Sequence, residues 1–312
     1  MKARMLTIVW GPQHLDWFER ACVASLGQRD NFAALAEHVR TWDIVTQSSD
    51  AAAVQEIASR LQLPVELHTD QSLGGSPGMT LQREIMAQMM RCLDDQSALF
   101  MAPPDSIFGD GTVQSVFAIG QPKAVCVAVP HVRVTPQILK EPAPGRTNAA
   151  LVAASWRHLH RTWIEAEATR EQTNTWAGGV SWRKVGADLY AVTHRLPTVY
   201  LAQFDQTDLQ WWTTWQAQRG LNGAWDHFWP SKLVAESRQR VVGSSDAAFI
   251  AEVTPEFGNI PPCSASDPEE PDKCWGQGAH FVINRNVMAF FRAELPPAMH
   301  LSTGAPVLEA AE

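Results

Sequence analysis

The first 130 residues alternate short apolar runs with segments in which apolar residues recur every three or four positions. This alternation is typical of parallel β-strands joined by crossover helices. The strands are expected at Arg4–Trp10, Val39–Thr46, Pro64–His68, Ala98–Ala102 and Ala124–Val129, and the helices at Leu15–Leu26, Ala51–Leu61 and Thr80–Leu93. Asp50 and Thr80 stand where helix N-caps belong. The pattern therefore predicts an α/β fold with an open, mostly parallel, helix-covered sheet of the Rossmann-like kind.

A proline-rich stretch at Pro130–Pro144 marks a change of pattern, and an α+β half is expected beyond it. Its predicted helices are Asn148–Glu167, Asp208–Arg219 and a closing helix at Gly278–Arg292. Its predicted strands are Val180–Tyr190, Thr198–Leu201 and Arg238–Val242. A long exposed loop is expected at Thr254–Gly276. We divide the chain into a first half, 1–135, and a second half, 136–312, which together form one continuous domain.

Composition narrows the class of protein. A hydrophobic content of 45% predicts a large buried core, and the thirteen Trp residues supply broad apolar surfaces, some of which are expected to line a pocket. The net charge of -8, without any Lys/Arg run, does not favour extended nucleic-acid binding. Five scattered Cys without CxxC spacing fit a reduced, cytoplasmic protein. No stretch has the length of a membrane span.

The clearest candidate chemistry follows the strand expected at Ala98–Ala102. Pro103 and Pro104 come next, and because proline cannot donate to a sheet, the strand must end there. Asp105 is then expected at the carboxyl end of a central strand, where open parallel sheets bind ligands, although an Asx turn is an alternative explanation. Asp110 is explained by capping of the helix that follows it.

Short motifs distributed along the chain resemble those of bacterial GT-A-type glycosyltransferases. The matching elements of the first half are Trp10-Gly11, Ala24-Ser25-Leu26 with Asn31 and Leu35-Ala36, Ile44-Val45-Thr46, and the run from Pro104 to Gly111. Those of the second half are Thr193-His194-Arg195-Leu196-Pro197, Trp225-Asp226-His227 and Ser244-Ser245-Asp246. The resemblance extends from about residue 5 to residue 255.

The resemblance implies a GT-A-like fold whose first half binds a nucleotide-sugar donor. It assigns Trp10, Gly11 and Thr46 to contacts with the donor nucleotide. It assigns Asp105 to a divalent cation, Mn²⁺ or Mg²⁺, that bridges the donor diphosphate and stabilises the leaving group. Pro103 stands where the Asp-x-Asp signature of that superfamily has its first acid.

The resemblance also implies roles for residues of the second half, which binds the acceptor. His194 would contact the diphosphate or the metal, and Asp226 or Asp246 would act as general base for the acceptor in an inverting displacement. Each has a structural alternative as well: a hydrogen bond to a backbone carbonyl for His194, a turn for Asp226, and the N-cap of a helix at Ala247–Val253 for Asp246.

The function expected from the sequence is transfer of a sugar from a nucleotide-sugar donor to an acceptor hydroxyl. The acceptor can be a glycan, a lipid carrier, a small molecule or a modified nucleobase. Two alternatives stay open. The first is a non-catalytic nucleotide-sugar-binding or scaffold protein, which the loss of an acid at Pro103 favours. The second is a metal-dependent hydrolase built on the same Asp and His residues.

Overall fold

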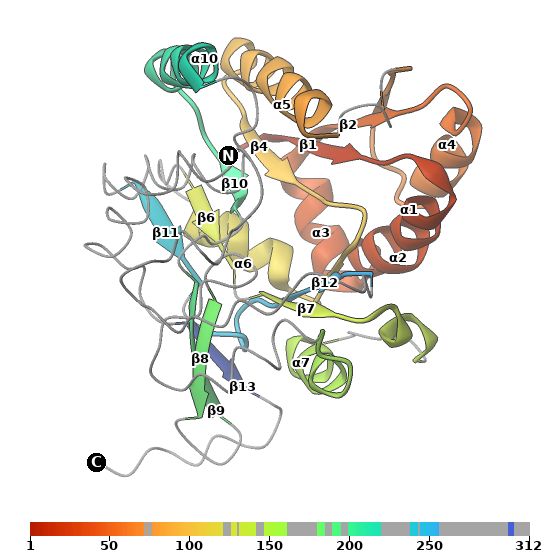
Figure 1. Ribbon diagram of the computed structural model, residues 1–312, viewed down its shortest axis with the longest axis vertical. Coiled ribbons are helices and arrows are strands. Elements are labelled where there is room, and N and C mark those ends of the chain that lie inside the picture. The colour runs from red at the N-terminus through yellow and green to blue at the C-terminus, as the bar shows by residue number, and fades with distance from the viewer. Residues whose placement is uncertain are drawn as a thin grey trace.

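The computed structural model describes residues 1–71, 73, 77–120, 126–129, 131–141, 147–160, 180–184, 189–194, 199–219, 238–242, 244–255 and 299–302. These residues form a seven-stranded main sheet and two three-stranded sheets (Figure 1). The main sheet has the order β11-β6-β10-β4-β1-β2-β3. Its strands are β1 (Ala3–Ile8), β2 (Val39–Thr46), β3 (Val65–Thr69), β4 (Ala98–Met101), β6 (Cys126–Ala128), β10 (Val199–Ala202) and β11 (Gln239–Val241).

The main sheet is mostly parallel. Strand β1 pairs in parallel with β2 and β4, β2 with β3, and β6 with β11. Strand β10 is antiparallel to both of its neighbours, β4 and β6. The expected open, mostly parallel sheet is therefore confirmed, and β1 lies in its interior.

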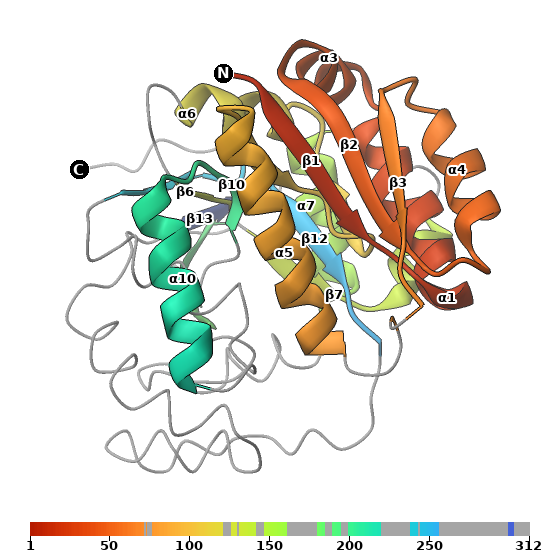
Figure 2. The ribbon, with the colours of Figure 1, turned by 90° about the horizontal axis from the view of Figure 1, so that it is seen from above.

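Helices cover both faces of the main sheet (Figure 2). One face carries α5 (Pro77–Asp94) and α10 (Gln206–Arg219), whose buried side chains Ile85, Met89 and Trp212 pack with Leu6 and Ile8 of β1. The other face carries α1 (Gly11–Trp17), the π-helix η1 (Phe18–Val23), α2 (Ala24–Leu26), α3 (Arg29–His38), α4 (Ala51–Ser59) and α6 (Thr112–Ile119). The alternation of side chains along β1 explains this division, because neighbouring residues of a strand face opposite sides of the sheet.

A second sheet lies beyond η1, in the order β5-β12-β7. Its strands are β5 (Ser106–Phe108), β12 (Ile250–Val253) and β7 (His131–Val134), with η2 (Pro136–Lys140) and α7 (Asn148–Arg157) packed beside them. Trp17 and Ala21 contribute to the core of this second sheet, whereas Phe18 and Cys22 contribute to the core of the main sheet. The helical segment after β1 therefore joins the two sheets.

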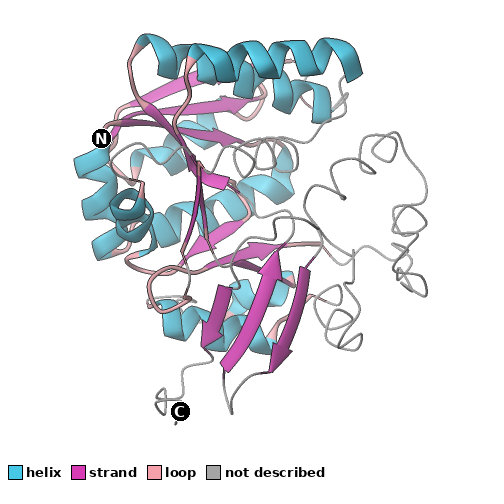
Figure 3. Ribbon diagram, turned by 90° about the vertical axis from the view of Figure 1, so that its left-hand side faces the viewer, coloured by secondary structure: helices cyan, strands magenta, loops and turns pink. Residues whose placement is uncertain are grey.

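The third sheet is antiparallel and has the order β13-β9-β8. Its strands are β13 (Met299–Ser302), β9 (Leu189–His194) and β8 (Val180–Lys184). Figure 3 shows it as a small sheet at the opposite end of the molecule from α5 and α10. The prediction of one strand at Val180–Tyr190 was therefore wrong, because β8 and β9 are separate antiparallel strands.

The helix predicted at Ala247–Val253 is also wrong, because this segment contains β12. Strand β12 is antiparallel to β5 and parallel to β7, so it is the central strand of its sheet. Ile250, Ala251 and Val253 of β12 are buried, and a short, largely apolar run does not distinguish such a strand from a helix. Consequently Asp246 caps no helix and lies exposed in the turn before β12.

Of the three expected helix caps, Asp50 lies at the expected N-cap position and the other two differ from the structure. Helix α5 begins at Pro77, so Thr80 lies inside it. Asp50 occupies the N-cap position of α4 without a capping hydrogen bond from its side chain. The carboxylate of Asp110 accepts hydrogen bonds from the backbone amides of Asp30 and Asn31, at the start of α3, while Gly111 is the N-cap residue of α6. Asp110 thus supports a helix distant in sequence rather than the one that follows it.

Some predicted elements lie outside the described residues. These are the closing helix at Gly278–Arg292, nearly all of the loop at Thr254–Gly276 and the end of the helix predicted at Asn148–Glu167. Among the helices that the structure describes, none combines the length and apolar character needed to cross a bilayer.

Candidate functional site

The strand order identifies the candidate site, which lies at the carboxyl ends of the strands of the main sheet. The chain forms β1, β2 and β3 in spatial order, then returns along α5 to form β4 on the other side of β1. In open parallel sheets, ligands bind outside the carboxyl ends of the strands at such a reversal. The segments at this position are those that follow Ile8 of β1 and Met101 of β4, since Leu6 pairs with Met101.

Trp10 and Gly11 form the turn after β1. Trp10 is partly exposed, and its ring stacks on His14 with a centroid distance of 5.7 Å. Gly11 has a φ of +76°, and a Cβ atom at this position would have no neighbour within 4 Å among the described atoms. The backbone turn is therefore open, and a ligand can approach it closely.

The carboxylate of Asp50 fixes this turn from the neighbouring segment after β2. Its Oδ2 atom accepts a hydrogen bond of 2.7 Å from the amide of Gly11, and its Oδ1 atom accepts one of 3.2 Å from the Ser49 hydroxyl. Because the Gly11 amide already has an anionic partner, it is not available to a phosphate group. The turn therefore suits the uncharged nucleoside part of a ligand better than its diphosphate.

Thr46 ends β2, but its side chain lies in the protein interior. The residue is fully buried, its carbonyl accepts a hydrogen bond from the Asp70 amide at 2.8 Å, and its hydroxyl has no hydrogen-bond partner among the described residues. A ligand at this edge therefore meets the backbone around Thr46 before it meets the Thr46 side chain.

Asp105 lies after β4 and directly before β5, where the chain leaves the main sheet for the second sheet. Its carbonyl accepts a hydrogen bond of 2.7 Å from the Val253 amide, and the register of the two strands pairs Ser106 with Glu252. Glu252 is in turn held by Arg133 of β7, with 3.1 Å between Arg133 Nε and Glu252 Oε1. The second sheet therefore brings Glu252 and Arg133 next to Asp105.

The surroundings of Asp105 favour its protonated form. Part of the residue surface is accessible, yet the carboxyl group is closely surrounded by protein atoms, and this desolvation together with the nearby charge of Glu252 raises the pKa of Asp105 to about 7. Burial, with Glu252 and Asp105 beside it, also raises the pKa of Tyr200. The charged groups that affect Asp105 are thus one carboxylate, Glu252, and one arginine, Arg133. A cation bound here would relieve the repulsion between them.

The sequence did not indicate Glu252, Arg133 or Tyr200. Glu252 falls in the segment wrongly predicted to be a helix, and Arg133 falls in a proline-rich stretch for which no strand was predicted. An alternating pattern of apolar and polar residues does exist at His131–Val134, but four residues are too few to identify a strand by periodicity.

The structure does not unite all the residues expected in the site. Asp246 lies beyond the end of the β5–β12 ladder at which Ile250 pairs with Phe108, whereas Asp105 lies at the other end. His194 is the last residue of β9 in the third sheet, and its side chain is not described. Asp226 lies outside the described residues.

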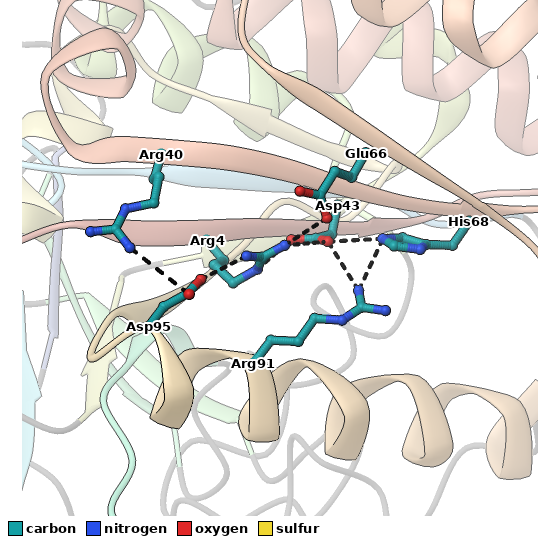
Figure 4. A network of polar contacts seen from close by, with 7 residues as sticks. All are labelled: Arg4, Arg40, Asp43, Glu66, His68, Arg91 and Asp95. Atoms are coloured by element: carbon teal, nitrogen blue, oxygen red, sulfur yellow. Dashed lines mark hydrogen bonds and ion pairs between the residues drawn. The ribbon is translucent and has the colours of Figure 1, made fainter.

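Asp105 and Glu252 are two carboxyl groups whose negative charges interact. Mg²⁺ is commonly bound through one or two carboxylates and completed by substrate phosphates, and Asp105 with Glu252 matches this mode. Asp43, Glu66 and His68 form the only group of three close ligand side chains in the described part of the chain. In this group, Arg4 and Arg91 donate hydrogen bonds to the carboxylate of Asp43, so a metal ion would have to replace them (Figure 4).

Comparisons with known proteins do not name a family. No family model matches the chain, and no curated protein matches its sequence. Among solved structures, the inositol-1-phosphate CTP transferase from T. maritima is similar with a TM-score of 0.37 and 8% sequence identity, covering 81% of this chain and 89% of that chain. A TM-score at this level does not establish a shared fold.

Proposed function

We propose that this protein is a glycosyltransferase that moves a sugar from a nucleotide-sugar donor to an acceptor hydroxyl. The observation that carries the proposal is the pairing of the open Trp10–Gly11 turn with the Asp105 carboxyl group across the β1–β4 reversal. One side of this edge is suited to a nucleoside and the other to a cation and a diphosphate. A nucleotide-sugar requires both.

In the proposed complex, the nucleoside lies against the turn after β1. The partly exposed ring of Trp10 offers a stacking surface, and Gly11 permits close approach of the ligand to the backbone. Thr46 contributes through the backbone at the end of β2. Asp50 keeps the turn in place by its hydrogen bond to the Gly11 amide.

Asp105, with Glu252, would hold Mn²⁺ or Mg²⁺ in this complex. The cation would supply Lewis-acid stabilisation of the charge that develops on the departing nucleoside diphosphate. Asp105 must be ionised to bind it, and binding of the cation displaces the proton that burial and the neighbouring Glu252 favour. We assign the acceptor base to the second half of the chain, where Asp226, Asp246 and His194 are candidates.

Binding of candidate donors tests the proposal directly. The purified protein is titrated with UDP-, GDP-, CDP- and dTDP-sugars, with and without Mn²⁺, in a calorimeter and in a thermal-shift assay. A donor at one hundred times its Kd should stabilise the fold by about 2.7 kcal/mol. Asp105→Asn should lose the Mn²⁺-dependent part of the affinity, and Asp110→Asn is the matched control that should retain it.

Product analysis then separates the alternatives. A transferase is supported if the sugar is transferred to an acceptor alcohol when one is present, and is released as free sugar only when none is present. Hydrolysis of phosphoesters that carry no sugar would favour the metal-dependent hydrolase instead. If no nucleotide-sugar binds under any condition, the proposed function is wrong and a scaffold role is favoured.

A further inference from the structure

A buried chain of hydrogen bonds ends on the carbonyl group of Ala102, directly after β4. The indole Nε1 of Trp42 in β2 donates a hydrogen bond of 3.0 Å to the hydroxyl of Thr7 in β1. That hydroxyl donates one of 2.7 Å to the Ala102 carbonyl, and the thiol of Cys22 in η1 lies 3.8 Å from the same oxygen. Each of these four residues is at most 1% exposed, so water does not compete for the bonds.

The direction of this chain follows from the chemistry of its members. An indole nitrogen only donates a hydrogen bond, and a carbonyl oxygen only accepts one. The Thr7 hydroxyl must therefore accept from Trp42, and its single proton points to Ala102. The Cys22 thiol is a weaker donor at a longer distance. The Thr7 hydroxyl is thus the main side-chain partner of the Ala102 carbonyl.

Ala102 precedes two residues that cannot donate main-chain hydrogen bonds. Its own amide still donates to the Leu6 carbonyl of β1 at 2.9 Å. Pro103 and Pro104 follow, and neither has an amide hydrogen. Since two successive residues offer no donor, a side chain supplies the hydrogen bond that fixes the path of the main chain where it leaves β4.

Asp105 comes next, in a turn that is held on both sides. Before the turn, the Ala102 carbonyl is held by Thr7. After the turn, the Asp105 carbonyl accepts a hydrogen bond of 2.7 Å from the Val253 amide of β12. The direction in which the Asp105 carboxyl group leaves the main chain therefore depends on both attachments.

The surroundings of Thr7 indicate that its hydroxyl serves these hydrogen bonds. Thr7 lies on the face of β1 that also carries Met5 and Val9, which are fully buried in the core of the main sheet. Valine has the same branched shape as threonine and avoids the cost of burying a hydroxyl. The polar group at this position is therefore explained by its bonds to Trp42 and Ala102.

We propose that Thr7 is a positioning residue, whose hydroxyl fixes the turn so that the Asp105 carboxyl group lies beside Glu252 and binds the divalent cation. This inference rests on the proposed function, which assigns the cation to these two carboxyl groups. Thr7 itself is buried and touches neither the cation nor the donor. It acts through the main chain between Ala102 and Asp105.

Paired substitutions separate the hydroxyl from the shape of the side chain. Thr7→Val keeps the branched shape and removes the hydroxyl, whereas Thr7→Ser keeps the hydroxyl. Amide hydrogen exchange of the full chain is measured at Val253 and at Ser106, whose amide closes the turn on the Pro103 carbonyl at 3.2 Å. Exchange at both amides should rise about tenfold in Thr7→Val and stay within about twofold of the parent in Thr7→Ser.

Two controls distinguish positioning from a general loss of stability. The Asp70 amide donates to the Thr46 carbonyl at 2.8 Å, at the end of β2, and its exchange in Thr7→Val should rise less than that of Ser106. An equal rise would mean that the hydroxyl only stabilises the core. Ile57→Val shortens a buried side chain of α4 and should keep the Mn²⁺ affinity of the parent.

Binding of Mn²⁺ alone tests the consequence for the site. Free Mn²⁺ is measured by electron paramagnetic resonance while the full chain is titrated with the metal. The affinity should fall about tenfold in Thr7→Val and stay within about twofold of the parent in Thr7→Ser, as for residues that orient metal ligands. If Thr7→Val does not fold, Trp42→Phe takes its place, because it removes the donor that orients the hydroxyl.

The outcomes separate this inference from the proposed function. A parent protein that binds no Mn²⁺ would overturn the proposed function and the positioning role with it. Equal Mn²⁺ affinities of the parent and Thr7→Val, or of the parent and Trp42→Phe, overturn the positioning role alone. Unchanged exchange at Ser106 and Val253 in Thr7→Val does the same.

Discussion

Asp105 and Asp110 lie in one short run of the sequence, yet the groups around their carboxyl groups differ. Asp105 lies beside another carboxyl group, whereas Asp110 accepts two backbone hydrogen bonds at 2.9 and 3.1 Å. We expect Asp105→Asn to leave the free energy of unfolding unchanged or slightly higher, because it removes a like-charge contact. The proposed sugar transfer should fall on the order of a hundredfold or more, since the proposed ligand of the cation is lost. Urea unfolding and initial rates check both expectations.

Asp110→Asn is the structural counterpart. Asn can still accept hydrogen bonds at the start of α3, but it lacks the negative charge that favours a helix N-terminus, so a loss of about 0.5 kcal/mol is expected. The proposed transfer should stay at the parent level. Equal losses of activity in the two variants would mean that the whole run serves the fold and not the reaction.

Asp50 gives a second test at the residue scale. Its carboxylate bonds the Gly11 amide instead of capping α4. Asp50→Ala should therefore speed hydrogen exchange at Gly11 and lower the free energy of unfolding by about 1.5 kcal/mol, the usual contribution of a hydrogen bond to a charged group. Asp50→Asn retains an acceptor and should restore most of the protection. If Asn and Ala behave alike, the charge and not the acceptor holds the turn.

At the scale of elements, β1, β2 and β3 are joined through the carboxylate of Asp43. Burial alone would raise the pKa of Asp43, but hydrogen bonds from His68 and Arg4 outweigh burial and hold it below the usual range. Asp43→Asn leaves the nearly buried Arg4 without its main counter-charge, so the free energy of unfolding should fall by about 3 kcal/mol. Glu66→Gln changes a partner whose side chain is 52% exposed, and less than about 1 kcal/mol is expected.

The same network predicts how acid acts on the fold. A carboxyl group with a lowered pKa in the folded state binds its proton more readily when the chain is unfolded. Its contribution to stability is therefore present above about pH 4 and is lost as the pH falls through the folded-state value. Denaturant unfolding between pH 2 and pH 7 should show this loss in the parent and a smaller one in Asp43→Asn. Identical curves would mean that other carboxylates determine acid sensitivity.

The elements differ in how far the sequence could predict them. Strands β1, β2 and β4 are flanked by turn residues and by clearly periodic helices, and the pattern locates them to within a few residues. Strand β12 resisted prediction because both of its faces are buried, and β5 and β7 because they are short. Helix α3 was not predicted either, since its polar residues obscure the apolar positions.

For the whole molecule, the edge of the sheet was predictable but its chemical surroundings were not. Local patterns are enough to place Trp10 and Asp105 after their strands. The carboxyl group of Glu252 reaches Asp105 only through the register of β5 and β12, two segments far apart in the chain. No local pattern encodes such a register. The resemblance to glycosyltransferases drew attention to Asp226 and Asp246, and it gave no indication of Glu252.

The position of β10 has a consequence for synthesis of the protein. Strand β10 lies between β4 and β6, although both precede it in the sequence. During synthesis on the ribosome, the sides of β4 and β6 that pair with β10 therefore stay unpaired until Val199–Ala202 emerges. Unpaired strand edges readily recruit other chains. A fragment of residues 1–160 should aggregate at concentrations where the full chain stays monodisperse, and light scattering measures the difference. A monodisperse fragment would mean that these strand edges are protected in another way.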